Sequence, residues 1–167
     1  VLLESAPGRA NVVARIGGDG ADGDGALLLH GHLDVVPADP ADWSVHPFSG
    51  EVRDGVLWGR GAVDMKNADA VLIALAAEWA RSGRRPQRDI VLAFTADEED
   101  TAEAGSQWLV ERHPELFDRM WSAVIIDESQ RVLPAKSSLT KDQSQQLASS
   151  LQERAQEIAV VETKDSG

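Results

Sequence analysis

The sequence contains no cysteine in 167 residues. This absence excludes disulfide frameworks, thiol nucleophiles and zinc sites built from thiolates. A metal ion bound by this protein must therefore be held by histidine nitrogens and carboxylate oxygens. The chain has four histidines and 28 acidic residues that can supply these atoms.

Clustered positive charge, long apolar runs and a signal peptide are also missing. Lys and Arg number 16 and the net charge is −12, which disfavours nucleic-acid binding because phosphate neutralisation needs clustered Lys and Arg. No run approaches the ~18 apolar residues of a membrane span, and the first residues do not resemble a signal peptide. We therefore expect no nucleic-acid or membrane partner and a cytoplasmic location. The chain begins with Val1 instead of Met, so we expect the natural N-terminus to lie upstream.

What is present is the composition of one globular domain. Hydrophobic residues make up 43% of the chain and charged residues 26%, a balance that is typical of folded soluble proteins. A chain of this length can bury a hydrophobic core. We therefore expect an ordinary folded domain instead of a disordered segment.

Predicted strands and helices alternate along the first 128 residues. Apolar runs predict strands at 11–16, 26–29, 56–58, 89–95 and 122–126, and the runs at 11–16, 89–95 and 122–126 are rich in β-branched residues. The short run 26–29 is fully apolar, as expected of a central strand buried on both faces. Apolar residues at helical spacing predict helices at 67–81, ended by Gly83, and at 103–112, ended before Pro114. Such alternation is typical of a layered α/β sheet.

Two segments are expected to carry no chemistry. Residues 17–25 (GGDGADGDG) predict a plain Gly/Asp turn; a calcium loop is the alternative, but the terminal Glu of an EF-hand is lacking. Residues 129–167 are rich in Ser, Gln and Lys, with Leu147, Leu151 and Ile158 at helical spacing after a capping box at Thr140 and Gln143. We therefore divide the chain into residues 1–128 and a polar tail, 129–167, with one amphipathic helix.

Acidic and histidine side chains gather where the predicted strands end, the edge at which ligands bind in open α/β sheets. They are His32 and Asp34 after strand 26–29, Glu98 and Glu99 after strand 89–95, and Asp127 and Glu128 after strand 122–126. Asp64 lies in a glycine-rich loop that leads into the first helix. Taken singly, a lone histidine is more often a packed residue than a ligand, and Asp64 suits a helix N-cap. Taken together, three strand ends deliver metal-binding atoms to one rim.

Imidazole and carboxylate are the groups that hold zinc when cysteine is absent. Asp34 follows His32 by two residues on an extended segment, so its side chain can accept the ring N–H and orient the ligand. Two metal ions ~3.5–4 Å apart are usually bridged by a carboxylate and activate a water molecule. A further carboxylate then transfers the proton. The neighbouring Glu98 and Glu99 can supply one proton carrier and one ligand.

Three motifs in this order resemble one known family. They are residues 31–37 (GHLDVVP), 59–66 (GRGAVDMK) and 97–99 (DEE), with Trp43 and Pro47-Phe48 between the first two. Over residues 8–128 the chain resembles the zinc-dependent family of acetylornithine deacetylase, succinyl-diaminopimelate desuccinylase, aminoacylase and glutamate carboxypeptidase. The resemblance implies the three-layer αβα sheet of zinc-dependent exopeptidases, incomplete here, with residues 1–128 as a partial catalytic domain.

The resemblance also implies a role for each site residue. His32 corresponds to a ligand of the first metal, and Asp64 to the carboxylate that bridges the two. Glu99 corresponds to a ligand of the second metal and Glu128 to a ligand of the first, with Asp127 as the alternative to Glu128. The catalytic pair is Glu98, the general base, and Asp34, which orients His32.

The implied activity is hydrolysis of a peptide or N-acyl amide bond by metal-activated water, in a small peptide or N-acyl amino acid. The implied cofactor is zinc, two ions per complete site, with cobalt or manganese as alternatives. The family's inserted lid domain also implies that the parent enzyme is a homodimer.

Two family features are not found in this sequence. No histidine follows residue 128, although the second metal keeps a later histidine ligand in this family, and no lid is recognisable. We therefore expect a truncated or fused chain with one occupied metal site and weak or no hydrolysis. The alternative is a catalytically inactive fragment that acts as a metal-binding or interaction domain.

The remaining histidines and acids are expected to be structural. His30 is expected to be packed, His113 to end a helix, and Arg60 to be structural. Asp97 and Asp100 are expected to be loop or cap acids, whereas His46 is a weaker candidate for the lining of the cleft.

Overall fold

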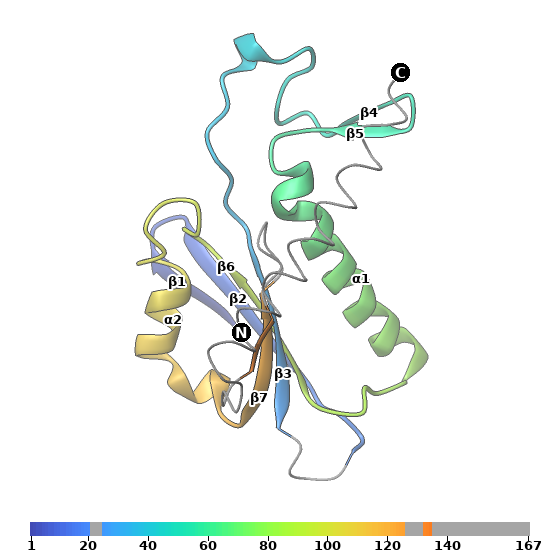
Figure 1. Cartoon of the computed structure of the whole chain (residues 1–167), viewed down its shortest axis with the longest axis vertical. Helices are drawn as coiled ribbons and strands as arrows, with labels where there is room; N and C mark the ends of the chain where they lie inside the picture. The colour runs from blue at the N-terminus through green and yellow to red at the C-terminus, as the bar shows by residue number, and fades with distance from the viewer. Residues whose placement is uncertain (21–24, 126–131, 135–167) are drawn as a thin grey trace, which may run out of the picture.

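The computed structural model describes residues 1–20, 25–125 and 132–134, which build a six-stranded mixed sheet (Figure 1). The strand order is β1-β2-β6-β3-β7-β8. The strands are β1 (Leu2–Ala6), β2 (Arg9–Ile16), β3 (Ala26–His32), β6 (Ile90–Thr95), β7 (Met120–Ile125) and β8 (Val132–Pro134). β3 runs parallel to both β6 and β7, whereas β1–β2, β2–β6 and β7–β8 pair in antiparallel fashion.

The strands predicted at 11–16, 26–29, 89–95 and 122–126 are confirmed as β2, β3, β6 and β7. The short, exposed β1 lacked a clear apolar pattern and was not predicted. β8 pairs with β7 although it follows residue 128, so the sheet continues past the predicted division of the chain. That division stays a prediction, and the expected tail helix lies outside the described residues.

A long loop connects β3 to the first helix and runs beyond the end of β3 (Figure 1). It contains a short 3₁₀ turn, Pro40–Asp42, and a two-stranded hairpin of β4 (Glu51–Arg53) and β5 (Val56–Trp58). The hairpin confirms the brief strand predicted at 56–58. The loop returns through a distorted helical turn, η2 (Ala62–Lys66), directly into α1.

Both predicted helices are present. α1 (Asn67–Ser82) ends at Gly83, whose φ of 67° is the left-handed conformation expected at a helix C-terminus. α2 (Ser106–Arg112) is followed by a short 3₁₀ helix, η3 (Pro114–Phe117). α2 begins three residues later than predicted, because residues 97–105 form turns held by backbone hydrogen bonds to Asp97 and Ala102.

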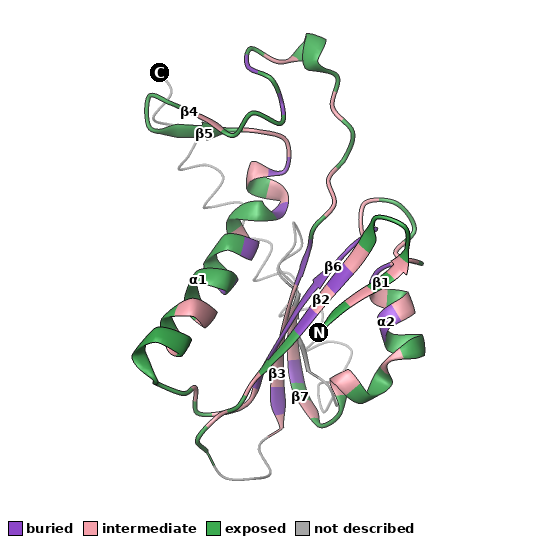
Figure 2. Cartoon of the chain, turned by 180° about the vertical axis from the view of Figure 1, so that it is seen from behind, coloured by how far each residue is buried: buried purple, intermediate pink, exposed green. Residues whose placement is uncertain are grey.

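The two helices cover opposite faces of the sheet, which confirms the three-layer arrangement (Figures 1 and 2). All six residues of β6 are buried. Leu92 and Phe94 pack in one cluster with Leu72 of α1, whereas Val91 and Ala93 pack in a second cluster with Leu109 of α2. The central strand therefore contributes to both halves of the core. No helix within the described residues has the length and apolar character needed to cross a membrane.

The exposed face of α1 differs from the expected one. Val71, Ala74 and Leu75, three of the residues whose spacing predicted the helix, are exposed. Its buried residues are Asp69 and Leu72. Because α1 is apolar on more than one side, the spacing predicts a helix without defining which side faces the sheet.

Candidate metal centre

The site forms where the parallel strands β3 and β6 end side by side. β3 ends at His32 and β6 at Thr95, and the Leu33 N–H donates to the Thr95 carbonyl at 2.7 Å. The His32 side chain is 1% exposed, and its backbone N–H donates to Met65 Sδ at 3.3 Å. The backbone that carries the imidazole is thus held both by the neighbouring strand and by the turn before α1.

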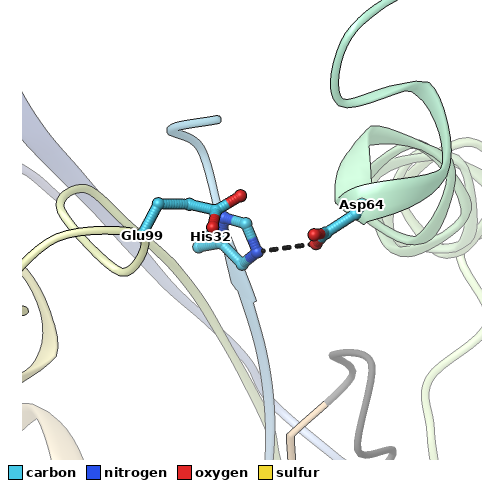
Figure 3. Close-up of side chains that lie close together, drawn as sticks. All are labelled: His32, Asp64 and Glu99. Atoms are coloured by element: carbon cyan, nitrogen blue, oxygen red, sulfur yellow. Dashed lines mark hydrogen bonds and ion pairs between the residues drawn. The ribbon is translucent and has the colours of Figure 1, made fainter. Parts of the chain in front are cut away.

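Asp64 reaches His32 from the turn that precedes α1 (Figure 3). Its Oδ1 lies 3.1 Å from His32 Nε2. Asp64 has non-helical backbone angles, and its peptide bond to Met65 is cis. The N-cap of α1 is Lys66, so Asp64 does not have the capping role that was its structural alternative. The Lys66 ammonium donates to the Leu33 carbonyl, which ties this turn to the end of β3.

Asp34 contacts His32 from the other side of the ring. His32 Nδ1 lies 3.1 Å from the Asp34 backbone carbonyl oxygen and 3.6 Å from its carboxylate. The nearer acceptor is therefore the carbonyl, whereas sequence reasoning assigned this role to the side chain. The Asp34 carboxylate instead accepts the backbone N–H groups of Glu98 and Glu99, each at 3.0 Å. No pattern in the sequence signals these two hydrogen bonds.

Glu98 and Glu99 follow β6 and face the same imidazole. Glu98 Oε2 lies 3.8 Å from His32 Nε2. Glu99 accepts the Val36 N–H at 3.3 Å and belongs to a group of potential ligands with His32 and Asp64. The ligand atoms of these three residues lie within 4.8 Å of one another. This spacing allows Glu99 to share one ion with His32, and it equally allows the second, neighbouring ion that the family resemblance implies for Glu99.

The types of the donor atoms, and the spacing of one pair of them, fit a zinc ion. Two ligand atoms of a tetrahedral zinc site, each ~2.0 Å from the ion, lie about 3.3 Å apart. The 3.1 Å between His32 Nε2 and Asp64 Oδ1 is close to that spacing. One imidazole and two carboxylates also match the borderline character of zinc. Glu128 and its alternative Asp127 lie outside the described residues.

The electrostatics of the site favour a cation. Burial lowers the pKa of His32, but the hydrogen bonds with Asp34 and Asp64 raise it. The nearby negative charges of Glu98 and Asp64 raise it further, and the net pKa is above its ordinary value. The imidazole therefore lies in a negative field that either a proton or a metal ion can neutralise.

The other candidate residues lie apart from this group. His30 Nε2 is 2.9 Å from Thr95 Oγ1, and His113 at the end of α2 is 3.3 Å from Glu115. His46 is exposed and accepts the Phe48 N–H within its own loop. The Arg60 guanidinium lies over the Trp43 ring, 5.5 Å from its centroid.

Asp97 is buried and caps its own loop, as expected of a loop acid. It accepts the Ala104 N–H and the Thr101 hydroxyl. The hydrogen bond from Ala104 is the main reason why the pKa of Asp97 is lowered, with smaller contributions from Thr101 and Arg9.

Comparison with known proteins finds relatives of one kind. Residues 28–158 match the profile of peptidase family M20/M25/M40. Succinyl-diaminopimelate desuccinylase from Bradyrhizobium sp. (strain ORS 278) is 44% identical over 123 residues, covering 68% of this chain and 31% of the relative. The N-fatty-acyl-amino acid synthase/hydrolase PM20D1 from Xenopus tropicalis is 37% identical over 106 residues, covering 64% of this chain and 20% of the relative.

Solved structures agree with this match. The structure of human carnosine dipeptidase 1 superimposes with a TM-score of 0.60 at 28% identity, covering 71% of this chain and 25% of that one. The chain thus spans under a third of the length of each of these relatives.

Proposed function

The chain belongs to peptidase family M20/M25/M40, and we propose that it forms the metal-binding part of a hydrolase that cleaves a peptide or N-acyl amide bond. The observation that carries the proposal is the convergence of His32, Asp64 and Glu99 at the carboxyl end of β3, with the Glu98 carboxylate beside them. These residues come from three segments that are far apart in the sequence. Their types are those that a cysteine-free zinc site needs.

We propose zinc as the ion, held by His32, Asp64 and Glu99. Glu128 is a further ligand on the strength of the family resemblance, and Asp64 is the bridging ligand wherever a second ion binds. Bound zinc supplies a Lewis acid that polarises a carbonyl oxygen and acidifies water. Cobalt and manganese are alternative ions.

Glu98 is proposed to carry the proton. Its side chain is 37% exposed, and its carboxylate lies 3.8 Å from His32 Nε2, so Glu98 is both next to the proposed metal ligands and accessible to water. A carboxylate in this position can accept a proton from the attacking water and deliver it to the amide nitrogen of the leaving group. Asp34 supports this step by orienting His32 and by holding the backbone of Glu98.

The proposed substrates are small N-acyl amino acids and dipeptides. The relatives are named for the removal of a succinyl group from diaminopimelate, for fatty-acyl amino acids and for a dipeptide. An acyl group joined to an amino acid by an amide bond is common to these names. The cytoplasmic location and the homodimeric parent enzyme remain predictions.

The test is turnover by the zinc-loaded chain with a panel of N-succinyl amino acids, N-acyl amino acids and dipeptides. We expect weak hydrolysis that a chelator abolishes. Glu98→Gln should lower the rate by about 10²-fold or more, as expected for loss of a general base, while zinc remains bound. Glu103→Gln, which changes an exposed acid of the same loop, is the matched control and should retain the rate. Equal rates for the two variants would refute the role of Glu98.

The alternative is a chain that binds metal without turnover. It is favoured by the ligands that a second ion would need, because the described residues form one group of three potential ligands, enough for one ion but not for two. We expect one zinc per chain after dialysis. Stoichiometric zinc without hydrolysis of any amide in the panel would support this alternative, whereas two tightly held ions would contradict the single site.

A further inference from the structure

The loop that carries Glu98 and Glu99 is fastened at both ends by one distant side chain. Asn11 lies on β2 and is fully buried, at 0% exposure. Its Oδ1 accepts the Ala96 N–H at 2.9 Å, and its Nδ2 donates to the Ala104 carbonyl at 3.0 Å. One amide group therefore bridges the start and the end of the 96–104 loop.

The interior of the loop is held by carboxylates. Asp97, with a left-handed φ of 67°, accepts the Ala104 N–H at 3.2 Å and the Thr101 hydroxyl at 3.0 Å. Arg9 of β2 lies 3.6 Å from the Asp97 carboxylate. In the middle of the loop, Asp34 accepts the backbone N–H groups of Glu98 and Glu99. Strand β2 thus holds the loop ends, and the segment after β3 holds its centre.

Asparagine suits the bridge because it offers one acceptor and one donor in a single planar group. Aspartate would keep the acceptor for Ala96 but would turn an oxygen toward the Ala104 carbonyl. An apolar residue would leave the buried Ala96 N–H without this acceptor, which is costly, and would remove one of the two side-chain donors to the Ala104 carbonyl. The side chain at position 11 is therefore matched to the two ends of the loop.

We propose that Asn11 is a positioning residue of the metal centre, which acts by fixing the loop that places the Glu99 carboxylate next to His32 and Asp64. This inference rests on the proposed function for its metal, but the fastening of the loop can be measured without metal. Residues that support metal ligands typically change metal affinity by 10- to 100-fold when they are mutated. The same range is expected here, although Asn11 contacts none of the three ligands directly.

The experiment compares Asn11→Asp and Asn11→Ser with two controls in the full 167-residue chain. Val13→Ala alters a buried residue of the same strand that packs in the α2-side core, so it matches a general loss of stability. Ser5→Ala removes the other side-chain donor to the Ala104 carbonyl but leaves the bridge in place. Zinc affinity is measured by competition with a chromophoric chelator, below the unfolding temperature of each variant. Amide hydrogen exchange of residues 96–104 is followed in the metal-free chain.

We expect the Asn11 variants to bind zinc about 10- to 100-fold more weakly and to exchange the Glu98 and Glu99 amides faster than either control. If Asn11→Asp does not fold, the comparison with the controls uses Asn11→Ser alone. Native affinity in Asn11→Ser, or an equal loss in Val13→Ala, would overturn the inference and leave the proposed function intact. If the native chain takes up no zinc, the proposed function fails. Hydrogen exchange in the metal-free chain then tests by itself whether Asn11 holds the 96–104 loop. Unchanged exchange in Asn11→Ser would overturn that role, and faster exchange would support it.

Discussion

Asp69, in the first turn of α1, is a buried acid without a hydrogen-bond partner for either carboxylate oxygen. It is 4% exposed and lies against Gly31 of β3. Burial is the main reason why the pKa of Asp69 is raised, although Lys66 and His32 act in the opposite direction. An acid in the first turn normally favours a helix by its charge, but here burial makes the charged form costly.

Replacing Asp69 should therefore stabilise the protein at neutral pH. Because the folded state holds the Asp69 proton to a higher pH than the unfolded state does, stability is lost as pH rises through the folded-state pKa. Asp69→Asn does not titrate, so at pH 7–8 we expect its free energy of unfolding to exceed that of the native chain by about 1–3 kcal/mol. The gain should vanish near pH 4, where an unfolded aspartate also becomes protonated.

Urea unfolding at pH 4, 5.5 and 7.5 measures this difference. Asp100→Asn, which changes an exposed acid, should show no comparable gain at any pH. An equal gain in stability for Asp69→Asn at all three pH values would contradict the explanation that the charged form of Asp69 is costly in the folded state.

At the scale of elements, β3 and α1 approach closely at Gly31. A Cβ atom at this position would collide with Asp69 Oδ1 and lie 3.0 Å from Met65 Cε. We expect Gly31→Ala to lower the free energy of unfolding by about 1–3 kcal/mol through overpacking. Adding Asp69→Ala should recover part of that loss, which a double-mutant cycle can measure. The control is Gly17→Ala, because a Cβ at this position has no atom within 4 Å. Additive effects of Gly31→Ala and Asp69→Ala would refute the contact between these two positions.

The second helix depends on one buried side chain. Leu109 of α2 is 1% exposed and packs with Val91 and Ala93 of β6. Leu109→Ala should cost about 2–5 kcal/mol, because it removes buried apolar surface and leaves a cavity. The adjacent Val110 is 60% exposed, so Val110→Ala should change stability by about 0.5 kcal/mol or less. Chemical unfolding of both variants makes the comparison, and similar losses would contradict the packing of α2 on the sheet.

At the scale of the whole molecule, a metal ion at the site would join three segments. His32, Asp64 and Glu99 come from the end of β3, the turn before α1 and the loop after β6. Zinc at 100 times its dissociation constant should raise the free energy of unfolding by about 2.7 kcal/mol. Thermal unfolding with and without zinc tests this, and a chelator should reverse the shift. Asp64→Asn should abolish most of the stabilisation by zinc. Undiminished stabilisation in this variant would place the ion at another site.

The sequence by itself determined the layered α/β architecture and the residue types at the rim of the sheet. The apolar run of β6 predicts a central strand, and motifs around His32, Asp64 and Glu99 predict where ligands follow it. These features depend on residues that are close together in the sequence, so the local sequence pattern is enough to predict them.

Only the tertiary structure decided which side of α1 is buried and which oxygen of Asp34 lies nearer to His32. It alone brought Asn11 to both ends of the 96–104 loop. Asn11 lies 85 and 93 residues from its partners, and Asp34 lies 64 and 65 residues from Glu98 and Glu99. Periodicity and propensity describe a residue's near neighbours, whereas these contacts arise only when strands that are remote in sequence pair in one sheet.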